Sequence, residues 1–237
     1  SMNLWLYYLF VFFAIILLRY FLLAGGTYWL FYSSPNKTLS KISSKKKSSR
    51  QQLIRKDITL SIAAAMASAI CAALVMTVYD SGATVLYQSV EDYGICYLIF
   101  SFLGVVFLQD TCYYFLHRGF HHPALYNWLH KGHHRSKNPT PWTSFALDFP
   151  EALIQGLFLL TVVFVIPLHF AVVALRLFTM TIWSLVNHLG FELFPNFPNH
   201  WLGKWFISSD HHSLHHRKYT QNYGLYFTFW DRLLGTN

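Results

Sequence analysis

The stretch HRGFHHPALYNWLHKGHH, residues 117–134, brings six histidines into a chain that is otherwise apolar and aromatic. Directly before it, residues 95–116 carry one formal charge, Asp110, close to the end of the run. About 20 apolar residues are enough for a helix to cross the hydrocarbon core of a bilayer. This junction therefore predicts a membrane helix that leads into a histidine-rich cap.

The composition of the whole chain agrees with a membrane protein. Of its 237 residues, 54% are hydrophobic, 19% are aromatic and only 12% are charged, which lies outside the range of ordinary soluble domains. Residues 4–32 contain one charge, Arg19, and residues 58–79 contain none. The first of these runs is expected to be retained as a membrane span, because it is too long for a cleaved signal peptide.

A further apolar segment, residues 152–187, contains Arg176 as its only formal charge. The Ile166–Pro167 pair lies where a helical hairpin is expected to reverse, giving two shorter legs. The predicted fold is all-α, a multi-pass bundle of about four to five membrane segments with a helical cap. We expect residues 1–237 to form one integral-membrane domain, with N-terminal spans in 1–94 and the histidine region in 95–237.

The basic residues predict the orientation of the chain in the membrane. Sixteen of the eighteen lie on one side of this topology, which the concentration of Lys and Arg in cytoplasmic loops makes the cytoplasmic side. Half of these sixteen lie in the loop 33–57: Lys37, Lys41, Lys45, Lys46, Lys47, Arg50, Arg55 and Lys56. The net charge of +8 is then explained by topology and anionic lipids, and nucleic acid is not an expected partner.

Twelve of the thirteen histidines lie in two windows, residues 117–134 and 188–216; His169, beside the hairpin tip, is expected to be structural. Spacings of three and four residues place the rings of each cluster on an arc of roughly 100° or less on an α-helix. Crowded imidazolium ions repel one another, and crowded neutral rings leave polar atoms unpaired near lipid. A metal removes both problems, and eight imidazoles in three clusters are enough for two ions of iron, zinc or copper.

Three motifs carry a family resemblance: H-x3-H (His117, His121) and two H-x2-H-H motifs (His130, His133, His134 and His212, His215, His216). With NHLGFE at 187–192 and NYGLYFTFWDRLLGT at 222–236, residues 109–236 resemble the fatty acid hydroxylase superfamily, also called the sterol desaturase family. The resemblance implies a membrane-bound non-haem di-iron oxygenase. Such an enzyme uses O2 and two electrons to hydroxylate or desaturate a lipid C–H bond.

The resemblance also implies which residues bind the two iron ions: His117, His121, His130, His133, His134, His188, His212, His215 and His216. Glu192, four residues after His188, is a candidate direct or supporting ligand. His122 and His211 are candidates to orient a ligand ring by hydrogen bonding. Asp110 could hold an imidazole from the membrane side, or form only a helix-end hydrogen bond. Asp148 and Glu151 are expected to begin a helix rather than to do chemistry.

The partners follow from the same chemistry. The sequence has no Gly-rich dinucleotide motif and no haem module, so electrons are expected from a separate protein of the cytochrome or ferredoxin type. Lys131, Arg135 and Lys137 could form its docking face, or be solvated membrane-surface charges. The lipid is expected to arrive from the bilayer, along 95–116 and 152–187, unless those side chains only face lipid. The expected location is a bacterial inner membrane or the endoplasmic reticulum.

Three other functions fit parts of the pattern. A carotenoid-type hydroxylase also carries histidine boxes, although the WDRLLGT ending favours the sterol and fatty-acid branch. A catalytically idle protein could hold a structural zinc pair with the same ligands. A channel or metal carrier would need ligands along a path through the bilayer, and here they gather at one face.

Overall fold

The structure is a computed structural model that describes residues 3–33 and 47–237, and within these residues it is all-α. Helices and loops make up the described chain, with two isolated β-bridges and no strand. The expected fold class is therefore confirmed. The helices are α1 (Leu4–Tyr32), α3 (Lys47–Asp80), α4 (Gly94–Phe120), α5 (Pro123–Leu129), α6 (Phe149–Val162), α7 (Phe170–Asn187), α8 (Ser209–Lys218) and α9 (Phe229–Leu233). Short 3-10 turns are η1 (Val90–Asp92), η2 (His133–Arg135), η3 (Pro141–Thr143), η4 (Phe197–Asn199) and η5 (Gly203–Trp205).

Among the described residues, four helices, α1, α3, α4 and α7, are long and apolar enough to cross a membrane. The fifth apolar helix, α6, has 14 residues and extends roughly 21 Å, less than the roughly 30 Å of a hydrocarbon core. The predicted hairpin is present, because α6 and α7 are joined by residues 163–169, which include Pro167. Only its second leg is long enough to span.

The second span begins earlier than the sequence predicted. Helix α3 begins at Lys47 rather than at residue 58, so the last part of the expected basic loop is helical. Asp57 lies within this helical extension and is buried. Its carboxylate accepts hydrogen bonds from two hydroxyl groups, which allows a charged residue to be buried directly before the apolar part of the helix. Lys37, Lys41, Lys45 and Lys46 of the predicted loop lie outside the described residues.

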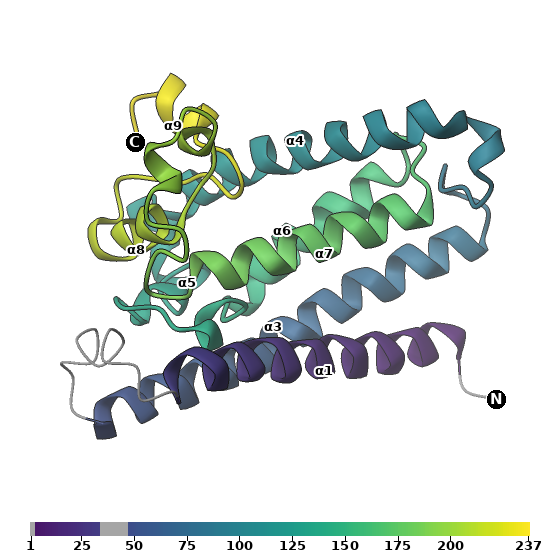
Figure 1. Ribbon diagram of the computed structural model, residues 1–237. Coiled ribbons are helices and arrows are strands. Elements are labelled where there is room, and N and C mark those ends of the chain that lie inside the picture. Colours follow the sequence, from purple (N-terminus) through teal and green to yellow (C-terminus); the bar gives the residue numbers. More distant parts are fainter. Residues whose placement is uncertain (1–2, 34–46) are drawn as a thin grey trace.

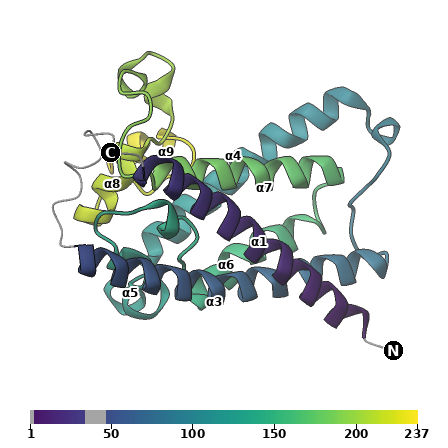
Figure 2. The same cartoon turned by 60° about the horizontal axis from the view of Figure 1, so that its bottom comes forward.

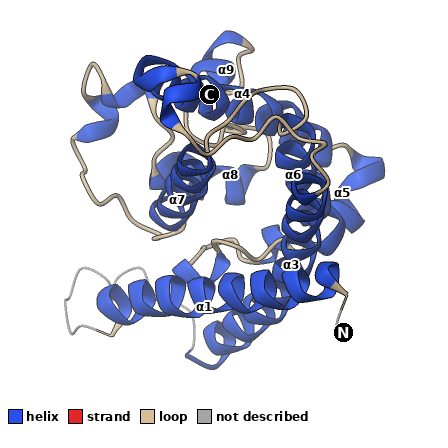
Figure 3. Cartoon of the chain, turned by 90° about the vertical axis from the view of Figure 1, so that its right-hand side faces the viewer, coloured by secondary structure: helices blue, strands red, loops and turns tan. Residues whose placement is uncertain are grey.

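The long helices lie side by side, and the short ones gather at one end of the bundle (Figure 1). That end holds α5, α8, α9 and the C-terminus, whereas the turn between α3 and α4 lies at the opposite end. In Figure 2, α1 crosses α3 obliquely, and Figure 3 looks along the bundle, with α7 across from α3 and α6. The arrangement separates an apolar helical region from a polar cap.

Small residues bring α3 and α6 close together. Ala64 and Ala67 of α3 are buried against Ala152 of α6. A Cβ atom at Gly156 would approach within 2.5 Å of the sulfur of Cys71, so the thiol of α3 packs directly against the backbone of α6 there. Close packing through small residues is the usual way in which helices associate in lipid. It fixes the beginning of α6 beside the histidine-rich cap.

Candidate metal centre

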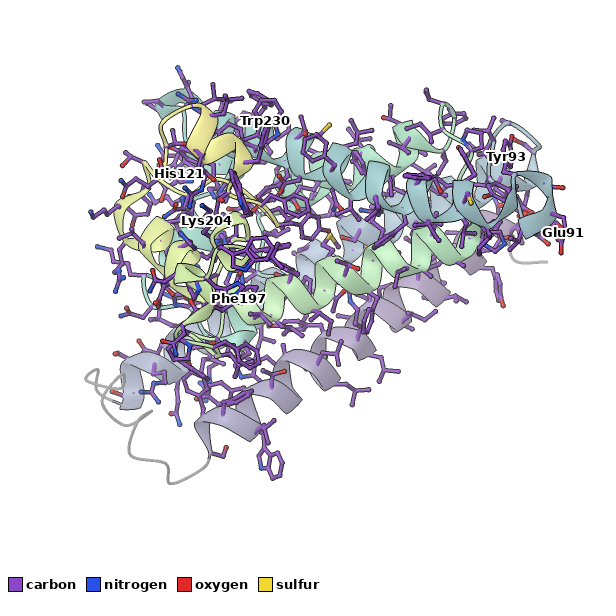
Figure 4. The ribbon with its side chains drawn as sticks, turned by 45° about the horizontal axis from the view of Figure 1, so that its top comes forward. Glu91, Tyr93, His121, Phe197, Lys204 and Trp230 are labelled. Carbon is purple, nitrogen blue, oxygen red and sulfur yellow. The ribbon has the colours of Figure 1, made fainter. Side chains whose placement is uncertain are left out.

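Nine histidines from four parts of the chain converge at the capped end of the bundle. His117 and His121 come from the end of α4, and His188 follows the last residue of α7. Helix α8 contributes the third motif, with His212, His215 and His216. Figure 4 shows this end, where His121 and Lys204 are labelled, opposite the turn that holds Glu91 and Tyr93.

The second motif does not lie on a helix, which corrects the sequence prediction. Helix α5 ends at Leu129, and His130 is its C-terminal cap. His133 and His134 lie in the 3-10 turn η2. The chain folds tightly here because the amide of Gly132 donates to Asp148 at 2.8 Å, and a Cβ at this position would collide with that carboxylate. Gly132 therefore leaves room for the carboxylate that shapes the turn.

The nine rings form two groups, and each group presents ligand atoms within 4.8 Å of one another. All of the rings are buried except His121, which is partly exposed. The groups do not follow the sequence motifs, because the second and third motifs each contribute to both. The first group is His117, His121, His130, His134 and His215, and the second is His133, His188, His212 and His216.

Six of these rings have Nδ1 against an oxygen of the protein. Five face backbone carbonyls: His117 at Tyr223, His133 at Ala146, His188 at Ser184, His215 at Gln221 and His216 at Ser136, over 2.6–3.1 Å. A carbonyl oxygen only accepts hydrogen bonds, so Nδ1 carries the proton in each of the five. The neutral ring then has a free lone pair on Nε2, which is the atom that faces the group centre.

The Nε2 atoms of His133 and His188 are 3.5 Å apart, and both carry a lone pair by this assignment. No proton can lie between them while the rings are neutral, so a cation is needed to make the contact favourable. In the first group the Nε2 atoms of His117 and His130 are 3.0 Å apart, with the Nδ1 of His130 2.8 Å from the carboxylate of Glu151. The donor set in both groups therefore fits a first-row metal ion.

Burial keeps these rings neutral and ready to bind metal. It lowers the pKa of His121 and His133 to about 4 and that of His188 to about 3. Neighbouring histidines add to the effect, because a second positive charge would be repelled; the charge of His133 lowers the pKa of both His121 and His188. Metal binding needs the neutral imidazole, so the rings do not have to lose a proton at neutral pH.

Two carboxylates that the sequence did not single out as functional support the rings. Glu151 is fully buried in the first turn of α6. One of its carboxylate oxygens lies 2.8 Å from Nδ1 of His130, and the other accepts a hydrogen bond from Nε2 of Gln155 at 3.0 Å. Asp57 accepts from the hydroxyl of Ser136 at 3.0 Å, and the carbonyl of Ser136 in turn accepts from His216. Glu151 does begin a helix as expected, but it also contacts a candidate ligand. A signal was available, because Glu151 is the one acid in the apolar run that follows Pro150.

Asp110 does not hold an imidazole, which was one of the two roles considered for it, and its hydrogen bonds go to backbone amides of the C-terminal segment. One of its oxygens accepts from the backbone amides of Leu225, Tyr226 and Phe227, at 2.7–3.2 Å, and it contacts no histidine of either group. Asp231 accepts from the amides of Tyr223 and Gly224 at 2.9 Å. Together these carboxylates hold the C-terminal segment whose Tyr223 carbonyl orients His117.

The other proposed accessory residues lie outside both groups. Glu192 accepts from the amide of Asp210 at 3.2 Å, at the beginning of α8. His211 forms a capping pair with Ser208 at the same helix end, and the exposed His122 caps α5 by accepting from Ala124. His169 caps α7 and donates to the carbonyl of Gln88, consistent with its expected structural role.

An apolar cavity of about 560 Å³ extends from the second histidine group into the bundle. His133, His188 and His212 line its metal end, and mostly apolar side chains of α1, α3, α4, α6 and α7 line the rest. No histidine of the first group appears in this lining. The cavity therefore gives a long apolar molecule access to one of the two groups.

Exposed basic side chains surround the cap on its outer face. Lys131 and Arg135 flank the second motif, and both are exposed, as are Lys204, Arg217 and Lys218. The buried rings and the exposed cations thus alternate along the same short segments. This gives the histidine end a positive surface.

Comparison with known proteins supports the resemblance seen in the motifs. The family model described as fatty acid hydroxylase matches residues 102–236. Lathosterol oxidase of Rattus norvegicus is 36% identical over 159 residues, which cover 65% of this chain and 51% of that protein. The Delta(7)-sterol 5(6)-desaturase ERG3B of Gibberella zeae is 31% identical over 156 residues, 66% of this chain and 47% of that protein. The chain thus spans about half the length of the curated relatives it matches, and no solved structure shows significant similarity to it.

Proposed function

Since the chain belongs to the fatty acid hydroxylase family, we propose that it is a membrane-bound oxygenase with two iron ions. It would use O2 and electrons from another protein to hydroxylate or desaturate a C–H bond of a lipid. The observation that carries the proposal is the pairing of two histidine groups, one of which lines a long apolar cavity. When bound, the metal pair supplies the redox chemistry that activates O2, which zinc could not do.

The residues of the chain hold this centre in a fixed protonation state. Five backbone carbonyls each accept the Nδ1 proton of a candidate ligand, so Nε2 is available for the metal. Glu151 performs the same task for His130 with a carboxylate, which also increases the basicity of the ring. Six of the nine candidate ligands are thus oriented before a metal arrives.

The cavity would bind the hydrocarbon part of the substrate and exclude water from it. Its walls are mostly apolar along α1, α4 and α6, and its metal end would place a C–H bond beside His133, His188 and His212. Sterol relatives make a rigid ring system one candidate, and a fatty acyl chain is another. Both fit a long apolar cavity.

The exposed cations around the cap support an acidic electron donor of the cytochrome or ferredoxin type. Lys131 and Arg135 lie on the segments that carry buried ligands, so a donor docked there would be close to the metals. We propose that this face lies on the cytoplasmic side of the endoplasmic reticulum or of a bacterial inner membrane, because the basic beginning of α3, with Arg50, Arg55 and Lys56, lies at the same end. Residues 1–237 then form one membrane domain, with the chemistry confined to 95–237.

Metal and lipid analysis test the proposal together. Protein purified without oxygen should contain about two iron ions per chain, and should consume O2 when given a reductant. Lipids from cells with and without the protein should differ by a gain of one oxygen or a loss of two hydrogens. Two zinc ions, no iron and no O2 consumption would instead support the structural zinc protein.

A further inference from the structure

Arg176 is a buried cation without an anionic partner in the described part of the chain. It lies on α7 and is 4% exposed. Its side chain forms no hydrogen bond or ion pair with another described residue, and its Nε atom is buried without an acceptor. Its guanidinium carbon lies 5.5 Å from the centre of the Phe158 ring. A charge within a membrane helix is costly, and its usual explanation is a functional one.

The surroundings of Arg176 indicate what would pair with it. It lines the apolar cavity, whose lining in the described chain includes two arginines but no aspartate or glutamate. The other arginine, Arg19, donates to the hydroxyl of Thr181 at 3.2 Å and lies over the Phe145 ring. Arg176 has no such acceptor. The anion that would balance it must therefore enter with a ligand.

The position of Arg176 fixes the geometry of that ligand. It precedes His188, the residue directly after the end of α7, by twelve residues, which corresponds to roughly 18 Å along the helix axis. The cavity joins the two positions through apolar side chains. A ligand that reaches both needs a polar group at one end and a long hydrocarbon at the other.

We propose that the cavity binds a lipid carboxylate, with the carboxylate on Arg176 and the hydrocarbon directed toward His133, His188 and His212. This rests on the proposed function, because it names the substrate class of that oxygenase. A guanidinium matches a carboxylate in a bidentate pair with one charge on each side. A phosphate monoester carries nearly two negative charges, which one guanidinium does not neutralise. A neutral sterol or alcohol would leave the cation unpaired.

Binding without turnover tests this inference independently of the chemistry. The protein is placed in nanodiscs of zwitterionic phosphatidylcholine without reductant, and titrated with stearic acid, stearyl alcohol or stearyl phosphate. Protein-free nanodiscs measure the partition of each probe into lipid. The pH is alkaline, so that the carboxyl group of the probe is ionised. We expect the acid to bind about tenfold or more tightly than the alcohol, the range of a hydrogen bond to a charged group.

Three variants assign that preference to Arg176. Arg176→Gln should bind the acid and the alcohol within about threefold of each other, while its alcohol affinity stays at the wild-type value and shows that the cavity is intact. Arg176→Lys should keep part of the preference, because a charge remains without the bidentate fork. Arg55→Gln is the matched control: Arg55 is exposed and does not line the cavity, so the full preference should persist.

The outcomes separate this inference from the proposed function. Equal binding of acid and alcohol to the wild type, or an unchanged preference in Arg176→Gln, overturns the inference even if the protein oxidises lipids. Tighter binding of stearyl phosphate than of stearic acid also overturns it. A preference for the acid that depends on Arg176 supports the inference even in a protein that holds no iron and consumes no O2.

Discussion

Glu151 gives the sharpest test of how the fold prepares the metal centre. Its two oxygens receive Nδ1 of His130 and Nε2 of Gln155, so both act as acceptors. The change Glu151→Gln keeps the shape of the side chain, but its amide can accept at only one of the two atoms. The amide nitrogen of the substituted side chain would then face an N–H group of His130 or of Gln155, and two donors cannot form a hydrogen bond. We expect the affinity of the first histidine group for its metal to fall by about 10- to 100-fold, the usual effect of losing a carboxylate behind a ligand.

The exchange variant Glu151→Gln with Gln155→Glu separates hydrogen bonding from charge. It restores one acceptor for His130 and pairs the new amide with a carboxylate one turn away. The folded stability should return to the wild-type value, because no buried donor is left unpaired. The metal affinity should recover only in part, because the negative charge no longer touches the imidazole.

Metal competition with a chelator measures these affinities, with circular dichroism to confirm that each variant is folded. Glu192→Gln is the matched control, since the same change there affects a carboxylate outside both groups. It should leave both metal affinities within about twofold of the wild type. A folded Glu151→Gln protein that binds two metal ions as tightly as the wild type would refute the reasoning.

Three further predictions concern the histidine cap. His133→Ala and His215→Ala should each lower the metal content from about two ions to about one, because they belong to different groups; His169→Ala should leave it unchanged, and equal loss there would contradict the assignment. Gly132→Ala should destabilise the fold by about 1–3 kcal/mol, since its methyl group meets the partly buried carboxylate of Asp148, whereas Gly119→Ala has open space and should not lower the stability in thermal unfolding. Without metal, the free energy of unfolding should fall as the pH drops from about 6.5 toward 4. Over this range His133 takes up a proton in the unfolded chain, but in the folded chain its pKa of about 4 keeps it neutral, so protonation favours unfolding. Denaturant titrations that show the same stability at both pH values would contradict this prediction.

Some supporting residues could not have been identified from sequence, because their partners are distant along the chain. Asp57 reaches the cap through Ser136, which is 79 residues away, and Asp110 holds backbone amides more than 110 residues further on. Backbone carbonyls orient five of the rings, and a carbonyl leaves no trace in the residue type. Glu192 and His211 had suitable spacing from the motifs, yet both are used to begin α8. Spacing alone does not distinguish a ligand from a cap.

The sequence by itself determined the class of this protein. Apolar runs of sufficient length require membrane helices, and three histidine motifs at one side of those helices require a metal-binding cap, because neither crowded charges nor unpaired rings are stable there. Only the tertiary structure decided how the rings are shared. The tight turn at Gly132 sends His130 and His134 to one group and His133 to the other, since neighbours in a 3-10 turn point in different directions. The packing of α6 against α3 then placed Glu151 behind His130 and left Arg176 facing an apolar cavity, because helix contacts depend on side-chain shape across the whole bundle.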